Sequence, residues 1–329
     1  MTSIGYALSS EEHRPAELVT AAALAEHHGF GFALISDHFH PWIDRQGQSP
    51  FVWSVLGAIA NATERLVIGT GVTCPTMRIH PAIIAQAAAT TAALLPDRFF
   101  LGVGTGERLN EHVLGQAWPD WTTRADMLEE AVAVIRALWS GERTSHHGRH
   151  FTVENARIYT LPASLPPIHV AANGSRMAAV AGHIGDGLIG TGPDTAVTKA
   201  YRAAGGKGPR FGQVTVCWAQ TETRARRTAR TWWPTAAIHG NATQELAVPK
   251  DFEDLAGMVD EDDVAAVIPC GPNVQPILDA IGAYVDAGYD HVYLHQVGPD
   301  QEGFLDFAAR SLLPEFDREP AAAASLRYR

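Results

Sequence analysis

A repeated alternation of short apolar runs with longer helical segments is the feature that most constrains the fold of this chain. The predicted strands are residues 3–8, 32–36, 66–72, 98–106, 168–174, 187–192, 211–221 and 291–297. Short apolar strands that alternate with helices indicate a parallel sheet covered by helices. Eight such units within 329 residues favour a closed (β/α)8 TIM barrel over an open doubly wound sheet.

Two segments interrupt this alternation. Residues 146–162 are polar and rich in histidine, and they predict a β-hairpin. Residues 235–272 follow neither the strand nor the helix rhythm of the rest. We therefore expect a single α/β domain over 1–320, with insertions near 142–165 and 235–272, and a disordered tail at 321–329.

Composition excludes several classes of protein. Apolar residues make up 46% of the chain, enough for a large core, and the net charge of −11 argues against nucleic acid or an anionic membrane as the main partner. The N-terminus does not resemble a signal peptide, and no run reaches the roughly 18 apolar residues of a membrane helix. Three widely spaced cysteines suggest neither a disulfide framework nor a metal cluster. We expect a reduced, cytoplasmic protein with a small-molecule substrate.

Chemically versatile residues gather where the predicted strands end. SDHFHPW (36–42) follows the second strand, TGERLNEH (105–112) the fourth, ANGSR (172–176) the fifth and TGPD (191–194) the sixth. Active sites of TIM barrels lie at the C-terminal ends of the strands. These four loops are therefore expected to converge on one site.

The SDHFHPW segment allows three interpretations. Asp37 can cap the following turn, as aspartate often does. His38 and His40 can ligate a metal, although Pro41 biases His40 toward an extended backbone. His38 can instead act as a general base, because a neutral imidazole accepts protons near neutral pH. Trp42 is either a core residue or a flat wall against a ring system.

Two glycine-containing strand ends and one helix start also suit ligand binding. Glycines at 69 and 71 indicate either a barrel bend or a backbone surface beneath a planar cofactor. GVGTGE (102–107) lacks the third glycine of a dinucleotide fingerprint, and its Glu107 is either solvated or an acid opposite His38. Asn173, Gly174 and Ser175 open a helix, which is either ordinary capping or an anion site.

Long segments of the chain resemble a known family, the luciferase-like oxidoreductases. The resemblance lies in SDHFHPW, CPTMRIHPAIIAQA (74–87), LLPDRFFLGVGTGERLNEH (94–112), and IHVAANG with AGHIGDG (181–187), and it extends over most of residues 3–315. The most similar group is the glucose-6-phosphate dehydrogenases that use coenzyme F420, an 8-hydroxy-5-deazaflavin. The fold implied is the same TIM barrel.

The resemblance implies roles for individual residues. His38 would be the catalytic base, and Trp42, Glu107 and Glu11 would complete the catalytic group. A non-proline cis peptide is expected between Gly71 and Val72, beneath the deazaflavin. The residues implied or expected to bind the cofactor are Asp37, Gly71, Val72, Thr105, Gly106, Asn110, Asn173, Gly174, Ser175 and Thr191. No metal is expected, and a homodimer is the family expectation.

The later loops depart from the sugar-phosphate members of this group, in which lysines and an arginine hold the phosphate. The loop TGPDTA has no lysine here, and KDFEDLAGMVDEDDVAAV (250–267) is strongly acidic. Carboxylates near a phosphate would repel it. We therefore expect an F420-dependent oxidoreductase that transfers a hydride between the deazaflavin C5 and an alcohol or carbonyl substrate other than glucose 6-phosphate. An FMN-dependent monooxygenase and a metal-dependent barrel hydrolase remain the alternatives.

Overall fold

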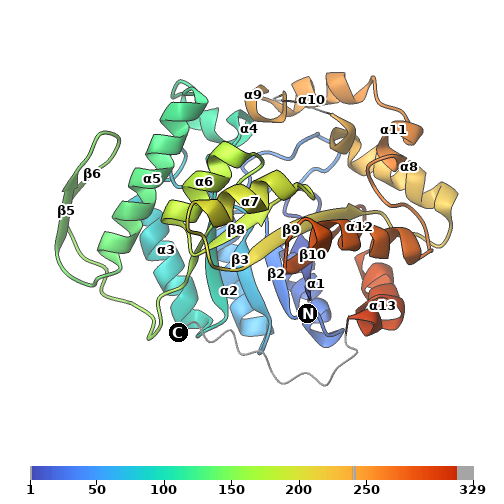
Figure 1. The fold of residues 1–329 in the computed structure, drawn as a ribbon, viewed down its shortest axis with the longest axis horizontal. Coiled ribbons are helices and arrows are strands. Elements are labelled where there is room, and N and C mark those ends of the chain that lie inside the picture. Colours follow the sequence, from blue (N-terminus) through green and yellow to red (C-terminus); the bar gives the residue numbers. More distant parts are fainter. Residues whose placement is uncertain (1, 239, 241, 317–329) are drawn as a thin grey trace.

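The computed structural model describes residues 2–238, 240 and 242–316, and its centre is a closed barrel of eight parallel strands (Figure 1). The strands are β1 (Ser3–Leu8), β2 (Phe32–Ile35), β3 (Val67–Thr70), β4 (Phe99–Val103), β7 (Ile168–Ala171), β8 (Gly187–Gly190), β9 (Arg210–Val216) and β10 (His291–Gln296). All eight predicted strands form, which confirms the TIM barrel. Most end two to five residues earlier than predicted, because the glycine-rich and polar residues at their tips belong to loops.

Helices surround the barrel on the outside. They are α1 (Pro15–His27), α2 (Val52–Ala62), α3 (Pro81–Leu94), α5 (Trp121–Leu138), α6 (Ser175–Ile184), α7 (Thr195–Ala203), α8 (Glu222–Trp232), α12 (Gln275–Asp286) and α13 (Gln301–Ser311). Proline occupies the first position of α1 and α3, where its missing N–H costs nothing. The helix faces toward the strands are apolar: Leu56, Ile84 and Leu128 are fully buried.

Large side chains fill the interior of the barrel below its rim. Phe100 stacks on Phe211 with ring centroids 5.1 Å apart, and Phe32 meets Phe211 edge-on at 5.3 Å. Leu34, Ile189 and Tyr293 complete this cluster of buried residues. The barrel is therefore a packed core rather than a pore, and a ligand can enter only from an end.

The predicted hairpin is confirmed as a two-stranded antiparallel sheet outside the barrel, β5 (Thr144–His147) and β6 (Thr152–Ala156). It stands beside α5 in Figure 1. Glu130 of α5 holds it there, because its carboxylate lies 3.0 Å from Nε2 of His146 and accepts the N–H groups of His150 and Phe151.

The second interrupting segment consists of short helices: η2 (Pro234–Ala237), α9 (Ala242–Glu245), α10 (Pro249–Ala256) and α11 (Glu261–Ala265). They lie in the same part of the molecule as α4 (Arg108–Glu111), which follows β4 (Figure 1). Phe252 of α10 is fully buried against Leu109 of α4 and Trp42. This segment therefore packs directly on the loops that follow β2 and β4.

The remaining elements are two short 3-10 helices, η1 (His112–Leu114) and η3 (Leu313–Glu315). Within the described residues, no helix has the length and apolar character needed to cross a bilayer. That residues 1–320 form one domain stays a prediction, and the tail at 321–329 lies outside the described residues.

Candidate active site

A cavity of about 570 Å³ opens at the C-terminal ends of the barrel strands. Leu34, Val72, Ala171 and Ile189 contribute apolar surface to it, at the upper boundary of the barrel core. A cavity of this volume suits a small molecule or the ring system of a cofactor. Eight of the predicted site residues line it: Glu11, His38, Trp42, Gly71, Val72, Glu107, Asn173 and Thr191.

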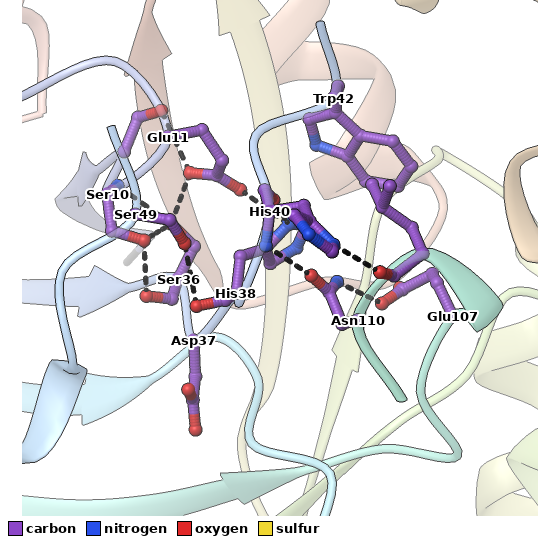
Figure 2. A network of polar contacts seen from close by, with 12 residues as sticks. Ser10, Glu11, Ser36, Asp37, His38, His40, Trp42, Ser49, Glu107 and Asn110 are labelled. Carbon is purple, nitrogen blue, oxygen red and sulfur yellow. Dashed lines mark hydrogen bonds and ion pairs between the residues drawn. The ribbon is translucent and has the colours of Figure 1, made fainter. Parts of the chain in front are cut away.

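His38 and Glu11 lie close together, and both line this cavity (Figure 2). Oε1 of Glu11 lies 3.3 Å from Nδ1 of His38, and the two side chains are only 4% and 10% exposed. The other carboxylate oxygen, Oε2, accepts the hydroxyl of Ser36 at 2.6 Å and that of Ser9 at 3.1 Å. Glu11 is thus held by the loop after β1 and by the residue that follows β2.

Electrostatics keep Glu11 ionised. Burial raises the pKa of its carboxyl, but the neighbouring His38 imidazole and the hydrogen bond from Ser36 outweigh burial, and the pKa lies below its usual range. An ionised carboxylate beside an imidazole orients the ring and selects its tautomer.

The surroundings of His38 determine which ring nitrogen carries the proton. Nδ1 faces two acceptors, the Glu11 carboxylate and the His40 carbonyl, each at 3.3 Å. Acceptors on this side place the hydrogen on Nδ1. Nε2 is then the basic nitrogen, and among the described residues the partners of this ring lie at Nδ1 alone. His38 can therefore accept a proton from a ligand in the cavity.

Asn110 fixes the loop that carries His38. Its Oδ1 accepts the backbone N–H groups of Phe39 at 2.9 Å and His40 at 3.2 Å, and its Nδ2 lies 3.4 Å from Oε2 of Glu107. Asn110 is 1% exposed and does not line the cavity. The structure therefore assigns it to positioning of the loop between β2 and α2, and direct contact with a cofactor stays a prediction.

Two tryptophans contribute flat surfaces. The Trp42 ring lies 5.1 Å from that of His38 and meets Phe252 edge-on at 5.2 Å. Trp232 and Trp233 pack against the same apolar cluster, and only Trp233 also lines the cavity. Trp42 is half-buried against the insertion and also lines the cavity. That it forms a flat wall against a ring system stays a prediction.

The loops after β7 and β8 meet at the cavity. Oγ1 of Thr191 donates to Oδ1 of Asn173 at 2.9 Å, and both residues are lining residues. Gly174 is the N-cap of α6 and Ser175 its first residue, and neither lines the cavity. No side-chain cap is formed there, so the first N–H groups of α6 have no side-chain acceptor at the N-cap. An anion site at Gly174 and Ser175 stays a prediction.

Asp37 points away from Glu11 and Trp42 in Figure 2 and does not line the cavity, in contrast to its predicted place in the cofactor pocket. Its carboxylate pairs with Nη2 of Arg78 at 2.8 Å and accepts the hydroxyl of Thr73 at 2.7 Å. Arg78 also lies 3.7 Å from Glu111, whose pKa burial raises to about 7. The buried guanidinium requires an anionic partner, and this requirement explains the orientation of Asp37.

The end of β3 has the expected backbone. A cis peptide bond joins Gly71 to Val72, and both residues line the cavity. Thr105 and Gly106 follow β4 but are not lining residues, so their contact with a cofactor stays a prediction. Gly106 has φ of 76°, and a Cβ there would lie 2.7 Å from Sγ of Cys74. This turn therefore needs glycine.

Several polar residues at or near the cavity, among them Ser36 and Glu12, had no predicted role. Ser36 is the last residue of the predicted strand 32–36, yet its hydroxyl donates to Glu11. Glu12 and His295 form a second buried pair, with Oε2 to Nε2 at 3.0 Å, and His295 lines the cavity. Two consecutive acids after the first strand were the available signal, because one side chain can turn toward each neighbouring strand.

The metal alternative finds no support in the geometry. Nδ1 of His40 donates to the carbonyl of Leu109 at 2.8 Å, and His38 pairs with Glu11. Within the residues that the structure describes, no group of three or more His, Cys, Asp or Glu side chains is arranged to hold a metal ion. Its three cysteines are free thiols.

Comparisons with known proteins show the family of this chain. A family model described as luciferase-like monooxygenase matches residues 1–291. An F420-dependent glucose-6-phosphate dehydrogenase of Segniliparus rotundus is 35% identical over 326 residues, which cover 94% of this chain and 97% of the relative. The corresponding enzyme of Mycobacterium tuberculosis strain H37Rv is 34% identical, with coverages of 96% and 98%.

A solved structure shares both fold and sequence with the chain. It is an F420-dependent secondary alcohol dehydrogenase in complex with an F420-acetone adduct. It superposes with a TM-score of 0.86 at 30% identity, covering 94% of this chain and 97% of the other. The chain therefore belongs to the luciferase-like monooxygenase family, in the branch that contains F420-dependent dehydrogenases.

Proposed function

We propose that this chain is an F420-dependent oxidoreductase that transfers a hydride between the deazaflavin C5 and an alcohol or carbonyl substrate other than glucose 6-phosphate. The observation that carries the proposal is the His38–Glu11 pair, which places a basic nitrogen in a cavity at the barrel rim. The relatives and the solved neighbour that depend on F420 support the choice of cofactor.

The lining of the cavity fits a flat heterocycle. Val72, Leu34 and Ile189 offer apolar surface for a ring face, and Asn173 and Thr191 offer polar atoms. We assign the cofactor to these residues together with Gly71, and we expect the cofactor phosphate near Gly174 and Ser175. When bound, F420 would supply the carbon that exchanges a hydride with the substrate.

Residues of the chain itself would handle the proton. Nε2 of His38 would accept the hydroxyl proton of an alcohol, or return one to a carbonyl oxygen. Glu11 would hold the ring and stabilise the imidazolium that forms, as a buried carboxylate does in other acid–base pairs. Glu107 and Trp42 line the same cavity and would orient the substrate. Proton transfer of this kind contributes roughly 10²–10⁴-fold to a rate.

Charge in the cavity supports an uncharged substrate. Among the described lining residues there is no lysine or arginine, whereas Glu11 and Glu107 are acidic. Lys250 is exposed and pairs with Asp254. The acidic residues of 250–267 do not line the cavity, so they would not contact a phosphate bound in it. The missing cationic partner is the stronger argument against a sugar phosphate.

The experiment that tests this function measures F420 binding by fluorescence quenching and then hydride transfer with 2-propanol, acetone and glucose 6-phosphate. We expect F420 to bind, turnover of an uncharged compound to exceed that of glucose 6-phosphate, and His38→Gln to lose at least 100-fold in kcat. His183→Gln, at an exposed histidine of α6, is the matched control. Absence of F420 binding would refute the proposal, and oxygen consumption with FMNH2 would favour the monooxygenase alternative.

We also propose a homodimer located in the cytoplasm. The dimer is proposed from the family resemblance and the location from the composition, and neither is proposed from a contact in this structure. Light scattering coupled to gel filtration tests the first, and a monomeric mass would contradict it.

A further inference from the structure

A second Glu–His pair lies beside the first. Glu11 and Glu12 are consecutive in the loop after β1, and β1 pairs with β2 on one side and with β10 on the other. Glu11 reaches His38, which follows β2, and Glu12 reaches His295 on β10. Both histidines line the same cavity. The loop therefore supports two imidazoles from opposite sides of one strand.

The second pair is more deeply buried than the first. The side chains of His295 and Glu12 are 3% and 0% exposed, and Oε2 of Glu12 lies 3.0 Å from Nε2 of His295. Oε1 of Glu12 accepts the N–H of Gly298 at 2.9 Å. The carboxylate thus faces Nε2 as an acceptor, and Nδ1 remains the accepting nitrogen of the ring.

The accepting nitrogen is poorly satisfied within the protein. The partner nearest to Nδ1 of His295 is the Thr215 hydroxyl, at 3.5 Å, which is the limit of a hydrogen bond. Thr215 also lines the cavity. The Trp233 ring meets that of His295 edge-on at 4.4 Å and borders the same space. A hydroxyl of a ligand could therefore bond to both Nδ1 and the threonine oxygen.

A purely structural role explains only part of this arrangement. Glu12 ties Gly298 to the loop after β1, and an apolar residue at 295 would serve packing equally well. Burial of a carboxylate with an imidazole is costly and seldom adds stability.

We propose that His295 and Thr215, held by Glu12, form a second polar anchor that selects uncharged substrates with a second hydroxyl or carbonyl group besides the reacting one. The inference rests on the proposed function, since His38 must act on the reacting group. The substrate class is that of neutral diols, hydroxyketones and unphosphorylated polyols. Glu12 is a positioning residue, and His295 and Thr215 determine specificity.

The test uses the F420-loaded protein with cyclohexanol and trans-1,2-cyclohexanediol, which differ by one hydroxyl. Binding is measured by saturation-transfer NMR titration, and turnover by loss of F420 absorbance. We expect the diol to bind about tenfold more tightly, the effect of one net hydrogen bond. His295→Phe should reduce this preference to about one, while His183→Gln should leave it unchanged. F420 affinity should stay within about twofold in every variant.

A second variant keeps the test decisive, because His295→Phe leaves Glu12 without its partner and can impair folding. Thr215→Val removes only a hydroxyl and should also lower the diol preference, severalfold. Three results with bound F420 would refute the anchor and leave the proposed function standing. The diol binds no more tightly than cyclohexanol, or the preference for the diol persists in both variants, or neither compound binds. If F420 does not bind, the proposed function fails and the anchor fails with it.

Discussion

Replacement of His169 by leucine should make the protein less sensitive to acid. His169 lies on β7 inside the barrel, fully buried, with its ring 4.8 Å from Phe100 and 5.1 Å from Phe211. Neither ring nitrogen has a hydrogen-bond partner among the described residues. Gly187 makes room for the ring, because a Cβ there would lie 2.3 Å from Nδ1. Burial first, and the nearby His291 second, lower the pKa of His169 to about 3.

The sign and size of the effect follow from proton linkage. The unfolded chain binds a proton at the ordinary pKa of 6.5, and the folded chain does so only near 3. Above about pH 6.5, His169 therefore does not change the free energy of unfolding. As the pH falls from 6.5 toward 3, His169 lowers that free energy progressively. Each pH unit in this window costs about 1.4 kcal/mol. Acidification from pH 7.5 to pH 5 should thus cost the wild type about 2 kcal/mol through this residue.

Urea unfolding at pH 7.5 and pH 5 measures this difference. His169→Leu should lose about 2 kcal/mol less than the wild type between the two pH values. His183→Leu, at an exposed histidine, should behave like the wild type. If His169→Leu and the wild type lost the same free energy of unfolding, His169 would have to titrate normally in the folded chain, and the reasoning would be wrong.

Three further predictions concern stability. Glu111→Gln should abolish a loss of stability that the wild type shows as the pH rises from about 5 to 7, because burial raises the pKa of Glu111 to about 7 and the folded chain favours the neutral form. The difference in unfolding free energy should be at most about 3 kcal/mol, and identical pH profiles would exclude it. Asn110→Ala leaves two backbone N–H groups without their acceptor. It should cost about 2 kcal/mol in denaturant unfolding, and a cost near zero would contradict the role of Asn110 in fixing this loop. Gly106→Ala places a Cβ 2.7 Å from a sulfur at φ of 76°. It should cost roughly 1–3 kcal/mol, whereas the control Gly57→Ala, which has open space around it, should be neutral or slightly stabilising in the same assay.

The barrel could be predicted from the sequence because the patterns that indicate its strands and helices are local. Each strand is a short apolar run bounded by polar or glycine-rich residues, and the alternation with helices permits few topologies. The rim loops followed from the same pattern. That principle placed His38, Trp42, Glu107 and Thr191 around one cavity, where the structure has them.

The partners of individual side chains could not be predicted in the same way, because they are residues distant in sequence. Asp37 turns toward Arg78, 41 positions later, and so leaves the cavity. His295 meets Glu12 across 283 positions. No periodicity encodes such pairs, since they depend on which strands become neighbours when the barrel closes. The residue types indicated the chemistry of the site, but the sequence did not indicate where each side chain points.

Because Glu11 and Glu12 are adjacent, the loop that carries them can vary only in certain ways among related sequences. A deletion or insertion between Leu8 and Glu11 would shift both acids together and detach both imidazoles in a single event. Substitutions at either position alter one partner and leave the other in place. The length of this turn is therefore expected to be inherited more strictly than its composition.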